Sequence, residues 1–372
     1  MPLTRAFYDT RTAGRRERAV LVGFDRQDSV DPEESLRELA LLADTAGADV
    51  CARLRQRRGR PRPATFIGKG KVEEATALLR EHDADLLIFD EDLSPAQVRN
   101  LEKAADAKVI DRSELILDIF ARRARTRESR LQVELAQLEY SLPRLTGMWK
   151  HLERLGGGIG TRGPGETQLE TDRRLVRTRI ANLRRQLERV ERERAVQRRS
   201  RAGAFRVAIV GYTNAGKSTL MKALTSAEVF IEDRLFATVD STTRRLKVGH
   251  KDHPVLVTDT VGFIRKLPHH LVASFRSTLS EVVEADLLYH VVDASDPAFP
   301  DHLAAVEQVL TDLGAENAPR LLLLNKVDRL EEEAREFARC RRPEAVLISA
   351  RTGLGLGEVK RRTLQARQER SG

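Results

Sequence analysis

Short apolar runs alternate with amphipathic helical patterns in the first third of the chain. The strand-like runs lie at 19–25, 48–54, 85–91 and 108–112, and the helical patterns lie between them at 33–47, 71–82 and 94–104. Buried strands alternating with helices indicate parallel strands joined by crossover helices. The pattern therefore predicts a small N-terminal parallel α/β domain over residues 1–112.

From about Ser113 the apolar spacing changes to that of packed helices. Two seams repeat every three or four residues, one at Leu131, Leu135, Leu138 and Leu142 and the other at Val176, Ile180, Leu183, Leu187 and Val190. Matching seams joined by a loop predict an antiparallel helical hairpin over residues 113–200. The loop between them, 156–165, holds six glycines and a proline, so we expect it to form the tip. Thr167 and Glu170 have the spacing of a capping box, which predicts that the second helix begins at Thr167.

Charge is concentrated in the same segment. The chain carries a net charge of +9, and residues 121–200 hold 20 Lys or Arg against 10 Asp or Glu, so the whole excess lies in that stretch. A basic segment between balanced ends favours a polyanionic partner, although a solvated helix face would also be charged. The two cysteines, Cys51 and Cys340, fit no metal-ligand spacing and are expected to be reduced thiols of a cytosolic protein. The longest apolar runs are too short to cross a bilayer, which argues against a membrane protein.

A second α/β pattern begins at residue 205 and carries a phosphate-binding motif. The apolar run 205–210 leads into Gly211-Tyr-Thr-Asn-Ala-Gly216-Lys217-Ser218, and a helical pattern follows. Strand, glycine loop and helix are the context that a P-loop requires. The glycines let backbone amides point at phosphates, Lys217 reaches the terminal phosphates, and Ser218 offers a hydroxyl to Mg²⁺.

Three further motifs follow in order, each at the end of an apolar run. Asp259 and Gly262 follow the run 255–258, where Asp259 would hold Mg²⁺, directly or through water, and Gly262 could offer its amide to the γ-phosphate. Asn325, Lys326 and Asp328 follow 321–324, and Ser349-Ala350 follow 345–348.

The motif of Asn325, Lys326 and Asp328 determines which base is bound. The two carboxylate oxygens of Asp328 match the two donors on the edge of guanine, whereas adenine would leave the carboxylate unsatisfied. The amide after Ser349 can reach the guanine carbonyl. The order of the four motifs predicts a Ras-like P-loop G domain over residues 205–372 that hydrolyses GTP. The first switch must lie in 235–245, where Thr238, Thr242 and Thr243 are all candidates for the Mg²⁺-binding hydroxyl.

These strings together resemble the HflX family of GTPases. The resemblance rests on GGGIGTRGPGETQLE (156–170), GYTNAGKS (211–218), LFATVDSTTRR (235–245) and DTVGFIRKLPHHL (259–271), with IGKGKVEE (67–74) in the first domain. It covers nearly the whole chain. It implies that Thr238 is the switch threonine, so that Lys217, Thr238 and Gly262 form the catalytic set and Ser218, Thr238 and Asp259 hold Mg²⁺.

The resemblance also implies the full set of nucleotide-binding positions. They are Gly211, Tyr212, Thr213, Asn214, Ala215, Gly216, Lys217, Ser218, Thr219, Phe236, Ala237, Thr238, Val239, Asp240, Asp259, Thr260, Val261, Gly262, Asn325, Lys326, Val327, Asp328, Ser349, Ala350 and Arg351. Asn214 matches the P-loop asparagine of potassium-stimulated relatives, which makes K⁺ a second expected cofactor.

The resemblance also implies a binding partner. The resemblance implies a cytoplasmic, monomeric protein that binds the large ribosomal subunit and its RNA when GTP is bound, and that splits or rescues stalled ribosomes under stress. The expected ribosome contacts at the hairpin tip are Gly156, Gly157, Gly158, Gly160, Arg162, Gly163 and Gly165. Phe263 stands where many GTPases carry a water-orienting glutamine, so we expect slow intrinsic hydrolysis that the ribosome stimulates. We expect no further domain after the helical pattern 354–370.

Two other functions remain open on the sequence. An ATP-driven RNA remodeller would use Gly68-Lys-Gly70-Lys71 ahead of a helix, but this string lacks the Walker spacing and is also typical of a basic turn at a helix start. A non-ribosomal G switch would dimerise through the hairpin, which explains the heptads and leaves the glycine-rich tip without a role.

Overall fold

The computed structural model describes residues 16–25, 32–57, 59–147, 164–199, 203–225, 235–246, 248, 254–268 and 276–371. The chain divides into two compact units. The first comprises Met1–Ile119 with Pro143–Thr171, and the second comprises Phe120–Leu142 with Asp172–Gly372. Each unit has its own sheet and its own apolar core.

The first unit contains a four-stranded parallel sheet with the order β2-β1-β3-β4. Its strands are β1 (Glu17–Phe24), β2 (Ala48–Gln56), β3 (Leu86–Phe89) and β4 (Lys108–Asp111). All four residues of β3 are buried, as expected for a strand covered on both faces. The prediction of a small parallel α/β domain is therefore confirmed.

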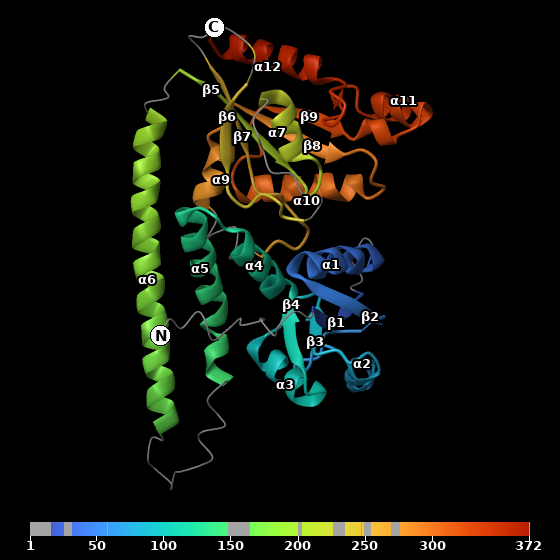
Figure 1. Cartoon of the computed structure of the whole chain (residues 1–372), viewed down its shortest axis with the longest axis vertical. Coiled ribbons are helices and arrows are strands. Elements are labelled where there is room, and N and C mark those ends of the chain that lie inside the picture. The colour runs from blue at the N-terminus through green and yellow to red at the C-terminus, as the bar shows by residue number, and fades with distance from the viewer. Residues whose placement is uncertain are drawn as a thin grey trace. The chain divides into compact units, whose positions relative to one another are not determined.

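Helices cover both faces of this sheet, with α1 on one side and α2 and α3 on the other (Figure 1). They are α1 (Pro32–Ala46), α2 (Lys69–Glu81) and α3 (Pro95–Ala105), and α4 (Arg112–Arg123) and the short helix η2 (Arg144–Gly147) follow. Ser94 and Gln97 cap α3 reciprocally, which satisfies two free backbone donors. Gly68 is the N-cap of α2, and its amide donates to Gln56 at 2.8 Å. The GKGK string is therefore a capped helix start in this structure.

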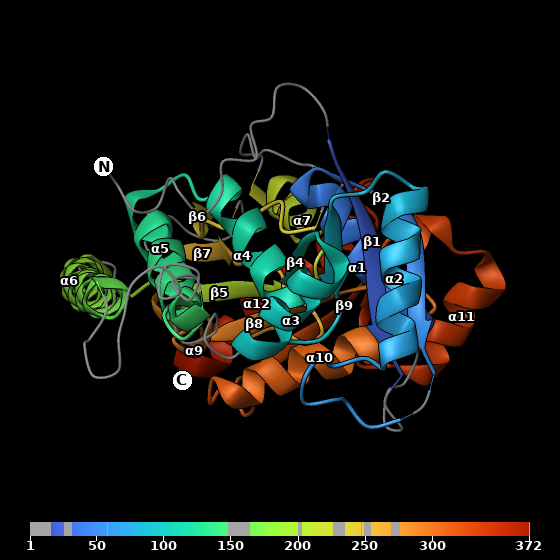
Figure 2. The ribbon, with the colours of Figure 1, turned by 90° about the horizontal axis from the view of Figure 1, so that it is seen from below.

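The helices of the hairpin are α5 (Arg127–Ser141) and α6 (Pro164–Arg199). The second unit begins at Phe120, in the last turn of α4, and contains α5 and the part of α6 from Asp172 onward. The two helices lie side by side and run in opposite directions (Figures 1 and 2). Arg179 of α6 donates to both carboxylate oxygens of Glu134 on α5, at 2.7 and 2.8 Å. Seam residues of both helices are buried: Leu131 and Leu135 of α5, and Val176, Ile180 and Leu183 of α6.

The start of α6 differs from the sequence prediction. The helix begins at Pro164, so Thr167 and Glu170 lie inside it and do not form its N-terminal cap. Proline at the first helical position needs no intrahelical donor and has a helical φ, which explains why the helix can begin there. Gly165, predicted to belong to the tip loop, also lies in α6. The remaining predicted tip residues, 156–163, lie outside the described residues.

The rest of the second unit is a six-stranded sheet with the order β10-β9-β8-β5-β7-β6. Its strands are β5 (Phe205–Gly211), β6 (Thr242–Arg245), β7 (Val255–Asp259), β8 (Leu287–Asp293), β9 (Arg320–Asn325) and β10 (Val346–Leu347). All neighbours are parallel except β6, which pairs antiparallel with β7. This is a P-loop G domain, as the sequence predicted.

Helices again cover both faces of the second sheet. They are α7 (Lys217–Thr225), α9 (Arg276–Val283), α10 (Phe299–Asp312), α11 (Glu332–Arg341) and α12 (Leu356–Ser371), with the single turn η4 (Val327–Arg329). Side chains of α7 and α12 share one core with the sheet, and side chains of α10 and α11 share a separate one. The carboxyl ends of β5, β7 and β9 lie at one edge of the sheet, where ligands of open α/β folds bind. Among the described residues there is no helix with both the length and the apolar character needed to span a membrane.

Candidate nucleotide site

The loop after β5 is shaped by two glycines that no other residue could replace. Gly211 and Gly216 have φ values of 155° and 94°. A β-carbon on Gly211 would overlap the carbonyl of Val291, and one on Gly216 would overlap the amide of Asn325. The chain therefore bends tightly between β5 and α7 and keeps its amides unshielded, which is the geometry of a phosphate-binding loop.

Three oxygen-bearing side chains meet beside this loop. The hydroxyl of Ser218 lies 2.8 Å from the hydroxyl of Thr238 and donates to Asp259 Oδ2 at 2.7 Å. Asp259 is 1% exposed, and its Oδ1 has no hydrogen-bond partner among the described residues. Burial raises the pKa of this carboxyl, although Lys217 opposes the shift. A buried oxygen without a partner beside two hydroxyls fits a hard cation such as Mg²⁺, which takes oxygen ligands.

The three threonines left open by the sequence occupy different places. Thr238 is the one whose hydroxyl contacts Ser218. Thr242 and Thr243 lie in β6, where the hydroxyl of Thr243 bonds that of Thr258 on β7 at 2.9 Å. The arrangement therefore favours Thr238 as the switch hydroxyl.

Lys217 is a buried cation with a partly compensated charge. Its side chain is 7% exposed, and its ammonium donates to the Tyr212 carbonyl at 2.7 Å. Burial lowers the pKa of Lys217 to about 8, with Asp259 opposing and Lys326 reinforcing the shift. An anion placed in the loop would raise this pKa again and favour the charged form further, so this ammonium is suited to phosphate.

The segment after β7 is held against the P-loop through its backbone. The amide of Thr213 donates to the Phe263 carbonyl at 2.7 Å, and the amide of Phe263 donates to the Gly211 carbonyl at 3.1 Å. The Phe263 side chain is 1% exposed. A β-carbon on Gly262 would come within 3.0 Å of Lys217 Nζ, so glycine keeps this approach open. The segment thus supplies backbone groups to the site and buries its one aromatic side chain.

A second set of residues, around Asn325 and Asp328, lies beside the P-loop at Ala215. Asn325 is buried and bridges two motifs, since its amide nitrogen donates to the Ala215 carbonyl at 2.8 Å and its oxygen accepts from Ala350 N at 2.9 Å. Asp328 Oδ1 accepts from the Ser349 hydroxyl at 2.6 Å, and Oδ2 accepts from Arg351 Nε at 3.1 Å. The bond from Ser349, and then Arg351, hold the pKa of Asp328 below its usual value. This carboxylate is therefore ionised and ready to accept two donors from a base.

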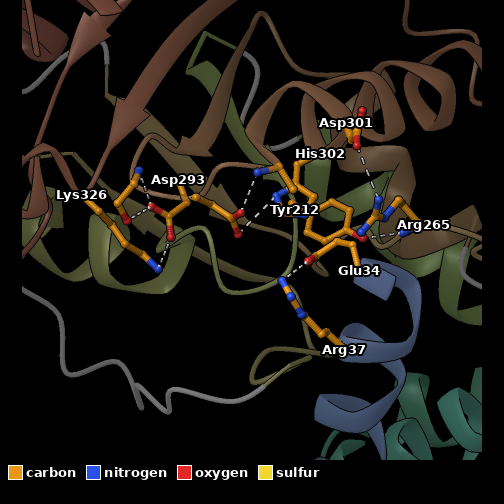
Figure 3. A network of polar contacts seen from close by, with 11 residues as sticks. Glu34, Arg37, Tyr212, Arg265, Asp293, Asp301, His302 and Lys326 are labelled. Carbon is orange, nitrogen blue, oxygen red and sulfur yellow. Dashed lines mark hydrogen bonds and ion pairs between the residues drawn. The ribbon is translucent and has the colours of Figure 1, made fainter. Parts of the chain in front are cut away.

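Figure 3 shows how the P-loop and the base motif are supported from outside the cavity. Lys326 pairs with Asp293 at the end of β8 at 2.7 Å. The ring of Tyr212 stacks on that of His302 in α10, with centroids 3.9 Å apart, and its hydroxyl accepts from the Arg265 amide at 2.9 Å. These contacts fix the backbone on both sides of the loop.

A cavity of about 350 Å³ extends from the P-loop, at Lys217 and Ser218, to the segment that contains Asp328. Its lining residues are Thr213, Asn214, Gly216, Lys217, Ser218, Thr219, Phe236, Ala237, Thr238, Gly262, Asn325, Lys326, Asp328, Arg329, Ala350 and Arg351. All of these except Arg329 belong to the set expected from the sequence. Arg329 follows the motif aspartate directly, and that adjacency was the only signal that could have identified it.

The other expected residues lie around the cavity and do not line it. Gly211, Tyr212, Ala215, Val239, Asp259, Thr260, Val261, Val327 and Ser349 lie in the buried shell behind the cavity, and Asp240 faces helix α5. Thr260 donates its hydroxyl to the Ile209 carbonyl at 2.6 Å, and Ser349 holds Asp328. Most of this shell therefore positions the lining residues.

Three sequence families match consecutive parts of the chain. They are described as GTP-binding GTPase N-terminal (residues 33–121), GTP-binding GTPase middle region (123–201) and 50S ribosome-binding GTPase (206–326). In fold, the chain is similar to a solved complex of SsGBP with GDP, at 23% identity and a TM-score of 0.51, over 96% of this chain and all of that one.

Curated relatives are far more similar in sequence. GTPase HflX of Escherichia coli is 48% identical over 95% of this chain and 83% of its own length. GTPase HflX of Caldanaerobacter subterraneus is 53% identical over 85% of this chain and 74% of its own length, and that of Flavobacterium psychrophilum is 51% identical over 84% and 76%. This chain is about half identical to these relatives over most of its length, and residues of all four predicted motifs line one cavity. It belongs to the HflX family of GTPases and is a GTP hydrolase.

Proposed function

We propose that this GTPase binds the large ribosomal subunit in its GTP-bound state and splits or rescues stalled ribosomes under stress. The observation that carries the proposal is the basic hairpin that shares a compact unit with the G domain. Arg174, Arg177, Arg185 and Arg189 of α6 are exposed. Guanidinium groups along a helix bind RNA mainly through its phosphates, so the interaction should weaken steeply with salt. The match to the family described as 50S ribosome-binding GTPase supports the same partner.

The glycine-rich tip is the second proposed contact with ribosomal RNA. Its residues Gly156, Gly157, Gly158, Gly160, Arg162, Gly163 and Gly165 are assigned on the family resemblance. A loop with few side chains can follow an irregular surface closely. The tip and the arginines of α6 would then bind one continuous stretch of RNA.

We assign hydrolysis to the cavity of the G domain. Lys217 would bind the terminal phosphates, and Gly262 would approach the γ-phosphate with its amide. Asn325 and Asp328 would hold the guanine. Ser218, Thr238 and Asp259 would hold Mg²⁺, which neutralises charge on the β- and γ-phosphates when bound.

Intrinsic hydrolysis should be slow. Phe263 cannot hydrogen-bond to water, and its side chain is buried. A partner that supplies the missing positioning group can accelerate a GTPase by about 10³–10⁵-fold. We therefore expect the ribosome to stimulate the reaction.

Potassium is the second proposed cofactor. Asn214 lines the cavity with a left-handed φ of 60°, which places it at the turn of the P-loop. An amide oxygen is a suitable ligand for a monovalent cation beside phosphates. Equal GTPase rates in KCl and NaCl would show that K⁺ is not a cofactor.

Two observations weigh against the alternative functions. Gly68 is the N-cap of α2 and the next three residues of the GKGK string lie in that helix, so the string does not form a P-loop, which weighs against an N-terminal ATPase. The seam residues Val176, Ile180 and Leu183 are already buried within one chain, which favours a monomer over a hairpin dimer.

Co-sedimentation with ribosomal subunits tests the proposal. The protein should pellet with the large subunit in the presence of a non-hydrolysable GTP analogue and stay in the supernatant with GDP or without nucleotide. Raising the salt should release it. If the protein binds guanine nucleotide but does not pellet with ribosomal subunits in any nucleotide state, its assignment as a GTPase stands and the proposed ribosome binding is wrong.

A further inference from the structure

The first switch segment is attached at one end to α4 and at the other end to the start of α5. Residues 236–240 run from the nucleotide cavity to the connection between α4 and α5. Thr238, whose hydroxyl contacts Ser218, lies in the middle of this segment. All of these groups belong to the second compact unit.

Asp240 makes the polar attachment. Its Oδ2 accepts from the Arg125 amide at 3.0 Å. Its Oδ1 accepts from the Thr126 hydroxyl at 2.6 Å and from the Thr126 amide at 3.4 Å. Thr126 is the N-cap of α5 and also accepts from the Ser129 amide at 3.1 Å. A carboxylate is favoured here because the first amides of a helix lack partners and carry partial positive charge.

Phe236 makes the apolar attachment. Its ring meets that of Phe120 edge to face, with centroids 4.7 Å apart and planes at 90°. Both rings are 2% exposed. Phe236 has a φ of 53°, an uncommon conformation for a bulky residue, which persists only where the surroundings hold it. The buried ring pair provides such a surrounding.

These two attachments limit where Thr238 can move. A residue two positions from a fixed neighbour on each side can shift only by the reach of two residues, at most about 7 Å. Asp240 does not line the cavity, although the family motif includes it among the nucleotide-binding positions. We propose that Asp240 is a positioning residue for GTP hydrolysis: it fastens the first switch to the start of helix α5 and so keeps Thr238 beside Ser218 and Asp259.

The inference concerns hydrolysis by the isolated chain, so it does not depend on ribosome binding. It also gives the hairpin a direct connection to the switch. A displacement at the start of α5 would reach Thr238 through Asp240, and one at the end of α4 would reach it through Phe236. No contact between Asp240 and the nucleotide is needed for this effect.

The test uses Asp240→Asn in the full chain. Asparagine keeps the size of the side chain but loses the charge, and its NH₂ group would face the Arg125 amide. We expect kcat to fall about tenfold and the Mg²⁺ concentration for half-maximal rate to rise, while GDP affinity changes less than about twofold. Hydrogen exchange at Arg125 and Thr126 should become about tenfold faster. Asp312→Asn, which changes an exposed carboxylate on α10, should change none of these.

A double-mutant cycle separates positioning from general stability. With Thr238→Ala in place, adding Asp240→Asn should slow hydrolysis no further, because the residue that Asp240 positions is already gone. Additive losses, or an unchanged Mg²⁺ dependence in Asp240→Asn, would overturn the proposal.

A second pair of variants covers the case in which Asp240→Asn does not fold. Thr126→Ala removes the hydroxyl that donates to Asp240, and Thr126→Ser keeps it. The alanine variant should show the loss of kcat and the serine variant should restore it to within about twofold. Equal hydrolysis rates for Thr126→Ala and Thr126→Ser would also overturn the proposal.

Discussion

Replacing Asp328 by asparagine should exchange the base preference of the site. Asp328 lies at the end of the cavity, where Ser349 and Arg351 each hold one carboxylate oxygen and the side chain is 13% exposed. Guanine offers two donors to this carboxylate. Asparagine could accept one of them and would point its own NH₂ group at the other.

The size of the effect follows from these contacts. A hydrogen bond to a charged group contributes about 1.5–3 kcal/mol, and a buried donor left without a partner costs about 1–3 kcal/mol. One lost bond and one unsatisfied donor together weaken GDP binding by about 3 kcal/mol or more, which is over a hundredfold. Xanthine carries a carbonyl where guanine carries the amino group, so it can accept from the new NH₂. Its affinity should rise.

Fluorescence titration of nucleotide-stripped protein with labelled GDP and XDP measures both affinities. Asp312→Asn is the matched control, since it removes an exposed carboxylate in the same unit. A GDP affinity within about threefold of the unaltered chain would refute the assignment of Asp328 to the base. So would a failure of Asp328→Asn to gain affinity for XDP.

Three further results should follow from the structure. Arg351→Ala should change GDP affinity less than about fivefold, because the Arg351 side chain is 76% exposed and exposed ion pairs contribute at most about 1 kcal/mol; the same titration measures it. His290 is buried in β8, and burial, with Arg320 adding to it, lowers its pKa to about 4, so its neutral form contributes stability above pH 6.5 that is lost as pH falls towards 4. Urea unfolding should show a loss of about 3 kcal/mol across this window that His290→Leu removes. Leu183→Ala should destabilise the second unit by about 2–5 kcal/mol in the same assay, because Leu183 is fully buried in the hairpin seam.

Local patterns predicted the four strands of the first sheet, four of the six strands of the second, and the place of the cavity, but not β6 or β8. The strands β5, β7 and β9 read as apolar runs, and the chemistry sits directly after each of them. Parallel strands bring these ends to one edge, so the sequence alone predicts that Lys217, Asp259 and Asp328 lie close together.

Contacts between distant segments could not be predicted. Asp240 and Thr126 are 114 residues apart, and no periodicity links a carboxylate to a particular helix start. The spacing within 235–245 left three threonines equivalent, and the path of the backbone past Ser218 distinguishes Thr238. The capping box failed for a local reason, because Pro164 can begin a helix as well as Thr167 can cap one.

Single-turnover GTP hydrolysis with and without purified large ribosomal subunits would show whether the ribosome stimulates this GTPase. We expect slow hydrolysis by the chain alone, because Phe263 positions no water, and a rate at least about 10³-fold higher with the subunits. Fast hydrolysis without ribosomes, or a rate that the subunits leave unchanged, would contradict this expectation.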